Sequence, residues 1–374
     1  NIFLSIKIFI GHKDMYKENN QEGKNINNNT FSLGSRVIGD KYKPLIIAEI
    51  GINHGGDLDL AKQFVELIAE AGGECAKFQI HVPEEEMSLE AKNIIPPNTN
   101  NKSIYSLIEE CSFTPDQDYE LKEFCESLGL IYLATAFSRK AADQLYEMNV
   151  DAIKVGSGEC NHLPLIEHIS KFNIPMIVST GMNSIDSVKE TENIISKYNT
   201  SYAFLHCTNR YPTEPEWVNL SGITEMKEKF NCTIGFSDHS IGSEIALSSV
   251  ALGANIIERH FTDDKNRDGA DISCSMDKKE LCWLISQSEN VWKAIGEGKK
   301  PHSSEQTTID FAFASLVAEE KIDIGEVLTS KNVWAKRPNT GISVSKYNEI
   351  ISNYYADVVI EKNEQITFSK IKKL

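Results

Sequence analysis

Residues 233–261 read TIGFSDHSIGSEIALSSVALGANIIERHF and contain two apolar runs separated by an amphipathic segment. The runs at 233–238 and 255–261 predict strands, and the apolar spacing of the segment between them predicts a helix. Each run ends in a polar cluster with a histidine, His239 in the first and His260 in the second. Parallel strands joined by a helix bring their carboxyl ends to one edge of a sheet, so we expect both histidines at that edge.

The same alternation of apolar run and amphipathic segment begins near residue 45 and continues along the chain. Six further runs that predict strands lie at 45–50, 75–80, 131–137, 152–157, 175–180 and 202–207. Eight strand–helix units within about 250 residues are what a (β/α)8 TIM barrel requires. A doubly wound parallel sheet is the alternative, but no GxGxxG segment follows the first strand, which disfavours it.

Polar or ionisable side chains stand at the carboxyl end of nearly every predicted strand. They are Glu49, Lys77, Gln79, Thr135, Lys154, Ser157, Glu159, Ser179, Asn209, Ser237, His239, Glu258 and His260. In a TIM barrel the strand ends meet at one face, and that face carries the chemistry. A lysine at the end of a core strand is costly unless its charge has a partner, so the pattern predicts an active site.

The charge of the chain limits the classes of partner. It has 54 Asp and Glu against 38 Lys and Arg, a net charge of −16, which disfavours nucleic acid as a partner. An anionic small molecule would therefore be bound by a few locally placed cations. Eight cysteines without a CxxC pair, and the absence of an apolar stretch of about 20 residues, favour reduced thiols, no membrane span and a cytoplasmic location.

Four segments are expected along the chain. Residues 1–32, with an apolar start and an Asn-rich tract, are predicted to be a disordered or artefactual tail. The barrel is expected over 33–296, followed by a Gly- and Lys-rich linker over 297–309 and a small domain of short strands over 310–374. Residues 81–114 form the longest insertion between a strand and its helix, a length typical of lids and binding segments.

Seven ordered motifs across residues 45–374 resemble those of the bacterial N-acetylneuraminate (sialic acid) synthase family. They are AEIGINHGG, KVGSGECN, STGMNS, LHCTNRYP, GFSDHS, ERHF, and DFAFAS followed by VWAKRP. The resemblance implies a TIM barrel with a C-terminal antifreeze-like (SAF) domain. It also implies condensation of phosphoenolpyruvate with N-acetylmannosamine and water, a divalent metal (typically Mn²⁺, with Mg²⁺ or Co²⁺ as alternatives) and a domain-swapped homodimer. The exact sugar is left open, with legionaminic or pseudaminic acid precursors as alternatives and the pseudaminic branch disfavoured by the AEIGINH and SGECNH forms.

The resemblance assigns roles to the matching residues. His239 and His260 would bind the metal. Phosphoenolpyruvate would be held by Lys77, Thr135, Lys154, Ser157, Ser179, Asn209 and Ser237. Gln79 and Tyr211 would bind the sugar beside the catalytic residues Glu49 and Asp271, Glu159 would assist proton or water handling, and Arg337 would reach the sugar of a partner subunit.

The residues themselves leave alternatives open. Two neutral imidazoles suit Mn²⁺ or Zn²⁺ and leave positions for substrate oxygens, although hydrogen-bonded loop histidines would give the same pattern. Asp238 and Glu258 would either orient the metal ligands or be solvated acids. A strand-end lysine could serve as the Schiff-base nucleophile of an aldolase rather than as an anion ligand, and the barrel could bind a sugar without catalysis. The serines lack a GxSxG segment, which disfavours a hydrolase.

Overall fold

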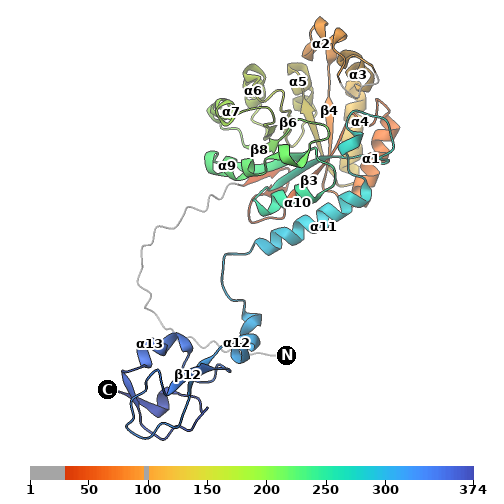
Figure 1. Ribbon diagram of the computed structural model, residues 1–374. Coiled ribbons are helices and arrows are strands. Elements are labelled where there is room, and N and C mark those ends of the chain that lie inside the picture. The colour runs from red at the N-terminus through yellow and green to blue at the C-terminus, as the bar shows by residue number, and fades with distance from the viewer. Residues whose placement is uncertain (1–29, 97–100) are drawn as a thin grey trace, which may run out of the picture. The chain divides into compact units, whose positions relative to one another are not determined.

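Eight parallel strands close into one barrel, in the order β10-β3-β4-β5-β6-β7-β8-β9 (Figure 1). The computed structural model describes residues 30–96 and 101–374. The barrel strands are β3 (Leu45–Gly51), β4 (Cys75–Ile80), β5 (Ile131–Ala136), β6 (Ile153–Val155), β7 (Met176–Ser179), β8 (Tyr202–Cys207), β9 (Thr233–Asp238) and β10 (Ile256–His260). Since β10 pairs with β3 and closes the sheet, the TIM-barrel prediction is confirmed and the doubly wound alternative is wrong.

A helix follows each barrel strand and packs on the outside of the barrel, because parallel strands need a crossover connection. The outer helices are α1 (Leu58–Glu70), α4 (Pro115–Ser127), α5 (Arg139–Glu147), α6 (Leu163–Ser170), α7 (Ile185–Lys197), α9 (Ser221–Lys229), α10 (Glu244–Ala251) and α11 (Lys278–Ile295). Thr114 and Asp277 form capping boxes that fix where α4 and α11 begin. The main core lies between the barrel and these helices, where Phe64, Phe204 and Leu281 are fully buried.

The insertion between β4 and α4 carries short elements of its own. They are α2 (Pro83–Glu86), η1 (Leu89–Asn93) and α3 (Ile104–Cys111), and α2 and α3 stand together beyond the end of β4 (Figure 1). Two further loops contain α8 (Pro215–Val218) and η2 (Ile272–Cys274). All of these loops follow the carboxyl ends of barrel strands, so the additional structure gathers at the face where the polar strand ends lie.

A β-hairpin precedes the barrel and closes its amino-terminal end. It pairs β1 (Phe31–Leu33) with β2 (Arg36–Ile38) in antiparallel register. Phe31, Leu33 and Ile38 are buried among the first interior residues of the barrel strands. The tail predicted over 1–32 is therefore wrong for its last residues, because their alternating apolar side chains form a strand with one buried face. Residues 1–29, where the rest of that prediction falls, lie outside the described residues.

The second unit, Glu297–Leu374, is built from short elements around its own small core. They are η3 (Ser303–Glu305), α12 (Gln306–Ala312), β11 (Ser315–Ala318), β12 (Val333–Lys336), η4 (Val344–Lys346), α13 (Tyr347–Ile350), β13 (Tyr354–Ala356), η5 (Phe368–Lys370) and β14 (Ile371–Lys373). Leu316, Leu328 and Ile350 are fully buried in that core. The predicted C-terminal domain of short strands is confirmed, and the segment predicted as a linker, 297–309, contains η3 and the first part of α12.

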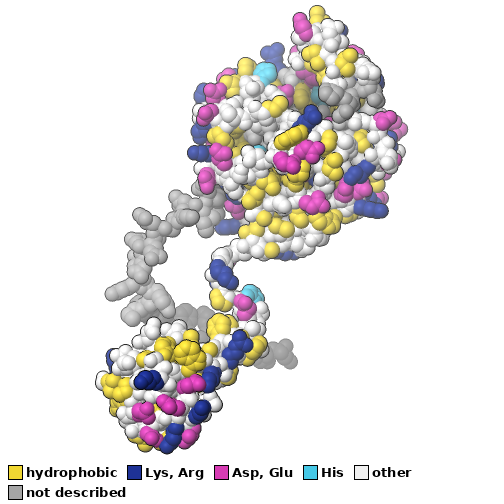
Figure 2. All heavy atoms as spheres, viewed as in Figure 1, with side chains coloured by type: hydrophobic (Ala, Val, Ile, Leu, Met, Phe, Trp, Pro, Cys, Tyr) yellow, Lys and Arg dark blue, Asp and Glu magenta, His cyan; other side chains and the backbone are white. Residues whose placement is uncertain are grey.

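Charged side chains of both signs are interspersed over the visible face of each unit, while hydrophobic side chains gather over α11 (Figure 2). Trp283 and Ile295 of α11 are 43% and 51% exposed, which is a large area for apolar side chains on one helix. Within the described ranges, no helix has the length and the apolar character needed to cross a bilayer.

Candidate active site

Alternate residues along each barrel strand point into the barrel, and this inward face changes character along the strand. On β10 the inward residues run from Ile256 through Glu258 to His260. Ile256 packs in the apolar cluster that the hairpin closes, whereas Glu258 and His260 line a cavity at the carboxyl-terminal end of the barrel. The barrel interior is therefore an apolar layer at one end and a polar cavity at the other.

The cavity gathers every predicted site residue except Asp271 and Arg337. The predicted residues that line it are Glu49, Lys77, Gln79, Thr135, Lys154, Ser157, Glu159, Ser179, Asn209, Tyr211, Ser237, His239 and His260. They come from all eight barrel strands or from the loops that directly follow them. Residues far apart in sequence meet here because the carboxyl ends of all eight strands meet at one face.

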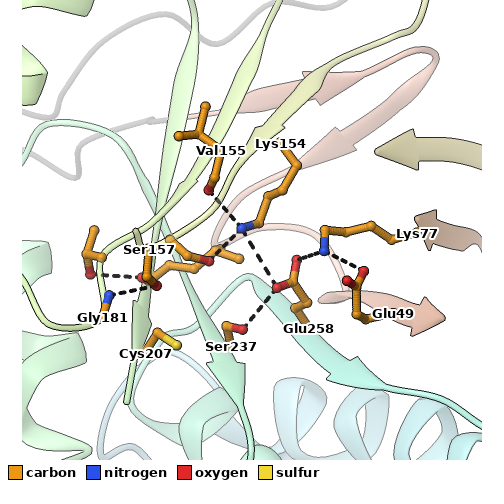
Figure 3. A network of polar contacts seen from close by, with 12 residues as sticks. Glu49, Lys77, Lys154, Val155, Ser157, Gly181, Cys207, Ser237 and Glu258 are labelled. Carbon is orange, nitrogen blue, oxygen red and sulfur yellow. Dashed lines mark hydrogen bonds and ion pairs between the residues drawn. The ribbon is translucent and has the colours of Figure 1, made fainter. Parts of the chain in front are cut away.

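Two lysines and two glutamates form a buried network of charges at the floor of this cavity (Figure 3). Lys77 pairs with Glu49, and its ammonium lies 3.5 Å from a carboxylate oxygen of Glu258. The Lys154 ammonium lies 3.8 Å from the other oxygen of Glu258, so this carboxylate stands between both cations. Each of the four side chains is at most 7% exposed. Charges so deeply buried persist only because each has partners of opposite sign.

The pKa values of these groups follow from burial and pairing. Burial lowers the pKa of Lys77, but the Glu258 and Glu49 carboxylates more than offset this, so the pKa lies above its ordinary value. For Lys154, burial outweighs the attraction of Glu258, and the pKa lies below its ordinary value. Burial would raise the pKa of Glu258, yet Lys154 and Lys77 hold it below its usual range. The network is therefore ionised at neutral pH at Glu258 and Lys77.

Serine hydroxyls lie beside the charge network. The Lys154 ammonium donates hydrogen bonds to the Ser179 hydroxyl at 2.6 Å and to the Val155 carbonyl at 3.0 Å. Ser237 donates to Glu258 at 3.0 Å, and Ser157 accepts the Gly181 N–H at 3.0 Å. A side chain at Gly181 would lie 2.3 Å from the Asn209 amide oxygen, so only glycine lets that loop approach the cavity so closely. The serine hydroxyls therefore add neutral hydrogen-bonding groups beside the charge network.

The two histidines lie side by side, with ring centroids 5.5 Å apart. Nδ1 of His239 lies 3.0 Å from the Thr208 carbonyl, so it carries the proton and donates, and Nε2 is left free as a ligand. Burial, with a contribution from His260, lowers the pKa of His239 to about 3, which keeps the ring neutral. Nδ1 of His260 is buried without a hydrogen-bond partner in the described structure. Free imidazole nitrogens of this kind fit a divalent transition metal.

The donor set for such a metal would consist of these two histidines. Among residues 30–96 and 101–374 no group of three or more His, Cys, Asp or Glu is arranged to hold a metal. The remaining positions would be filled by water or substrate oxygens, as in an open catalytic site. A buried ion pair holds the two histidines in register, since Asp238 and Arg259, the residues before them, lie opposite each other on β9 and β10 with 3.1 Å between charged atoms. Asp238 is thus a buried ion-pair partner, and the solvated-acid interpretation of it is wrong.

Asp271 lies beside the cavity rather than in its lining. Its carboxylate is 3.8 Å from Nδ1 of His260, and it lines a neighbouring cavity that shares Gln79, Glu159 and Tyr211 with the first. The outer wall of that second cavity is apolar and comes from the insertion, with Met87, Ile104 and Ile108. Arg337 belongs to the second unit, where it directly follows β12, and its role at the cavity stays a prediction.

Glu159 is placed at the boundary of the two cavities. One of its carboxylate oxygens is buried without a hydrogen-bond partner in the described structure. Burial raises the pKa of Glu159 to about 7, which gives it both protonation states near neutral pH. A group of this kind suits proton transfer.

Several lining residues were not predicted as site residues. They are Phe137, Gly156, Gly158, Met182, Cys207 and Glu258. None of the eight cysteines, Cys207 included, forms a disulfide. Glu258 was left open between a ligand-orienting role and a solvated acid, and the solvated interpretation is wrong because its side chain is only 7% exposed. The alternation of strand residues supplies the missing signal, since Glu258 stands two residues before His260 and shares its face.

Comparison with known proteins places the chain among sugar-acid synthases. Residues 64–300 match the NeuB family, and residues 313–372 match the SAF domain. The N,N'-diacetyllegionaminic acid synthase of Campylobacter jejuni is 36% identical over 332 residues, which cover 86% of this chain and 99% of that protein. Human N-acetylneuraminate-9-phosphate synthase is 38% identical over 307 residues, 80% of this chain and 85% of its own length. The crystal structure of N-acetylneuraminic acid synthetase from Leptospira borgpetersenii with citrate superposes with a TM-score of 0.69 at 34% identity, covering 75% of this chain and 95% of that one.

Proposed function

The chain belongs to the NeuB family of sialic acid synthase-type enzymes, and from this premise we propose its reaction. It condenses phosphoenolpyruvate with an N-acetylated amino sugar, N-acetylmannosamine first among the candidates, and with water. The products are N-acetylneuraminate and phosphate. The observation that carries the proposal is the pair of buried lysines, Lys77 and Lys154, in one cavity with two imidazoles.

The charges of the cavity favour an anion bound together with a divalent cation. Lys77 and Lys154 are matched by Glu49 and Glu258, so these four groups carry no net charge when all are ionised. Phosphoenolpyruvate adds a carboxylate and a phosphate, whose burial is unfavourable without further positive charge. A divalent cation at His239 and His260 would supply that charge, which is why we propose a metal-dependent enzyme with Mn²⁺ as the first candidate.

The residues of the cavity divide into those for the metal and those for the anion. His239 and His260 would hold the metal, which when bound acts as a Lewis acid on the sugar aldehyde. Lys77 and Lys154 would give charge-assisted hydrogen bonds to the carboxylate and phosphate oxygens. The neutral donors around them would complete the anion site, namely Thr135, Ser157, Ser179, Asn209 and Ser237.

The sugar would occupy the adjoining cavity, where Gln79, Tyr211 and Asp271 supply polar contacts. In the proposed reaction C3 of phosphoenolpyruvate attacks the aldehyde carbon, the new carbon–carbon bond forms, and the aldehyde oxygen takes a proton. Water then adds at C2, and the tetrahedral carbon expels phosphate as the C2 carbonyl forms. We assign the proton transfers to Glu159, because its pKa of about 7 allows it to give and to take a proton near neutral pH.

An aldolase mechanism through a Schiff base is disfavoured by the surroundings of Lys154. A nucleophilic lysine needs a free amine, whereas this nitrogen faces three acceptors, the Val155 carbonyl, the Ser179 hydroxyl and Glu258. Burial lowers the pKa of Lys154 and so favours the free amine, which keeps the aldolase as the second candidate. Borohydride trapping of the enzyme with substrate would reverse this assignment.

We also propose that the active enzyme is a homodimer in which Arg337 serves the partner's cavity. The apolar side chains gathered along α11 support a subunit interface, because exposed apolar patches of this kind mark interaction sites (Figure 2). Arg337→Ala and His239→Ala subunits, each nearly inactive alone, are mixed and allowed to exchange. In a swapped dimer one site carries both changes and the other is intact, so activity should return to about half per heterodimer. Activity that stays low after proven exchange would refute the swap.

The reaction itself is tested by measuring phosphate release from phosphoenolpyruvate with Mn²⁺ across a panel of amino sugars. The panel includes N-acetylmannosamine and the precursors of legionaminic and pseudaminic acids, which are the alternative substrates. We expect release that depends on one sugar and a product whose mass is that of the sugar acid. The Lys154→Met variant serves as the matched control and should lose the signal at low phosphoenolpyruvate. Binding of phosphoenolpyruvate without phosphate release for any sugar would favour a non-catalytic binding barrel.

A further inference from the structure

His81 directly follows β4 and connects the insertion to the cavity. Its imidazole side chain is 4% exposed, and it stacks on Phe137 with ring centroids 4.3 Å apart and planes 16° from parallel. His81 also lines the second cavity, next to Gln79. A polar ring this deeply buried needs a hydrogen-bond partner for each nitrogen, and both are present.

Both nitrogens of the His81 ring face oxygen atoms. Nδ1 lies 2.9 Å and 3.1 Å from the two carboxylate oxygens of Glu86 in α2. Nε2 lies 3.0 Å from the amide oxygen of Gln79. On its other side Gln79 donates from its amide nitrogen to Glu49 at 2.9 Å, and the second oxygen of Glu49 accepts from Lys77. One continuous chain of hydrogen bonds therefore runs from the insertion to the charge network.

This chain of hydrogen bonds determines which of its atoms are donors and which are acceptors. The Glu49 carboxylate only accepts, so the amide nitrogen of Gln79 must face it, and the amide oxygen must face His81. His81 must then donate from Nε2 to that oxygen, while its Nδ1 shares a hydrogen bond with the Glu86 carboxyl group. The contact with Glu86 holds the orientation of the ring.

We propose that His81 is a positioning residue of the sugar site, which acts by locking the amide of Gln79. This inference rests on the proposed function, in which Gln79 contacts the sugar. Without the Nε2 donor of His81, the Gln79 amide loses the contact on the insertion side that distinguishes its oxygen from its nitrogen. The amide is then held by Glu49 alone, and its presentation to the sugar becomes less firmly fixed. The phosphoenolpyruvate side of the cavity has its own contacts through Lys154 and Ser179 and should be affected little.

Two substitutions separate the two hydrogen bonds of His81. In His81→Gln the amide nitrogen takes the place of Nε2 and keeps a donor toward Gln79, whereas in His81→Asn it takes the place of Nδ1 and keeps the donor toward Glu86. Both variants lose the ring and its stacking on Phe137 and both carry a side-chain amide, so they are matched in these two respects. We expect His81→Asn to raise the KM for the sugar by about tenfold, the effect of one hydrogen bond, with the KM for phosphoenolpyruvate within about twofold of the parent. His81→Gln should restore the sugar KM to within about threefold.

A double-mutant cycle with Gln79→Met tests whether the effect passes through the amide. In the Gln79→Met background, His81→Asn should raise the sugar KM no further, because the amide it positions is gone. A sugar KM that rises equally in His81→Asn and His81→Gln, or that rises further in the Gln79→Met background, would overturn the inference and leave His81 a purely structural residue. Equal rises in the KM for both substrates would overturn it as well. A parent enzyme that releases no phosphate with any sugar would instead contradict the proposed function.

Discussion

The two ends of the barrel are built on the same eight strands and the same inward face, yet they differ in almost every physical property. At the amino end the inward side chains are apolar, and the hairpin closes over them with Phe31, Leu33 and Ile38. At the carboxyl end the same faces carry lysines, glutamates and histidines around an open cavity. Four residues along a strand separate the two environments, as from Ile256 to His260.

The difference separates the end of the barrel that stabilises the fold from the end where burial of charged groups is energetically costly. Each apolar side chain fully buried at the amino end contributes roughly 1.5–3 kcal/mol to folding. At the carboxyl end, burying Lys77, Glu49 and Glu258 costs desolvation energy, which their mutual pairing offsets. A division of this kind lets the strand ends hold charged groups in fixed positions, because the rest of the barrel is stable without them. The predictions below test that division, from the largest expected effect to the smallest.

Removing a metal-binding histidine should have the largest effect. His260→Ala or His239→Ala is expected to lower turnover by about 10³-fold or more, because a Lewis acid supplies several kcal/mol of transition-state stabilisation. Metal content and phosphate release are measured together, and excess chelator should reproduce the loss in the parent enzyme. His168→Ala, which removes a histidine of α6 that pairs with Asp143 of α5, is the control and should keep the metal. Full turnover in chelator would show that the carboxyl end works without a metal.

Removing the largest apolar side chain of the hairpin should affect stability alone. Phe31→Ala is expected to lower the unfolding free energy of the barrel by about 3–5 kcal/mol, the cost of a cavity in a core. The KM for phosphoenolpyruvate should stay within about twofold, because the hairpin lies at the opposite end from the lysines. Denaturant unfolding and initial-rate kinetics on the same preparation check both halves of the prediction. A tenfold change in KM for a folded variant would mean that the two ends are coupled.

Removing one lysine should affect affinity first. Lys154→Met is expected to weaken phosphoenolpyruvate binding by the roughly 1.5–3 kcal/mol of a charge-assisted contact, which is about 10- to 150-fold. Lys77→Met should in addition destabilise the fold, because it leaves Glu49 buried without its cation. Calorimetric titration of phosphoenolpyruvate and thermal unfolding separate the two effects. Binding to Lys154→Met within a factor of two of the parent would count against the anion site.

The smallest effect is expected for the pH dependence of the unfolding free energy that Glu159 causes. Its folded-state pKa of about 7 lies above the ordinary value of 4.5, so the folded state binds a proton that the unfolded state has lost between these values. Stability from this group is therefore present below pH 4.5 and is lost as the pH rises through 7. Glu159→Gln should raise the unfolding free energy at pH 8 by on the order of 1–2 kcal/mol relative to its effect at pH 4.5, while lowering turnover. An identical stability difference at both pH values would contradict the buried, shifted carboxyl group.

Much of the difference between the apolar and the polar end of the barrel could be predicted from the sequence. The eight apolar runs predicted the barrel strands to within about two residues, because period and length of such runs follow directly from which side chains must be buried. The placement of Lys77, Lys154, His239 and His260 at one face followed from their position at strand ends, since parallel strands align those ends. Their assignment to a metal and an anion came from the family resemblance and is still to be tested by experiment.

Other features were decided by the tertiary structure. The hairpin was missed because Phe31 and Leu33 stand in a short, polar-flanked run whose burial depends on the open end of a barrel built by later residues. Glu258 was ambiguous because a carboxylate at a strand end is stable in solvent or between two lysines, and only the closed sheet brings Lys77 and Lys154 to either side of it. The link from Glu86 through His81 to Gln79 joins a short helix to a strand end through side-chain geometry that no periodicity encodes.

By itself, then, the sequence determined the barrel, its second domain of short strands and the polar rim, because local alternation and strand direction fix which side chains face inward and at which end. The tertiary structure decided which carboxylate pairs with which lysine, which histidine nitrogen is free and which residues close the amino end. Those choices depend on distances between residues on different strands and loops, such as Lys77 and Glu258, and electrostatic and hydrogen-bond energies are set by such distances and by burial.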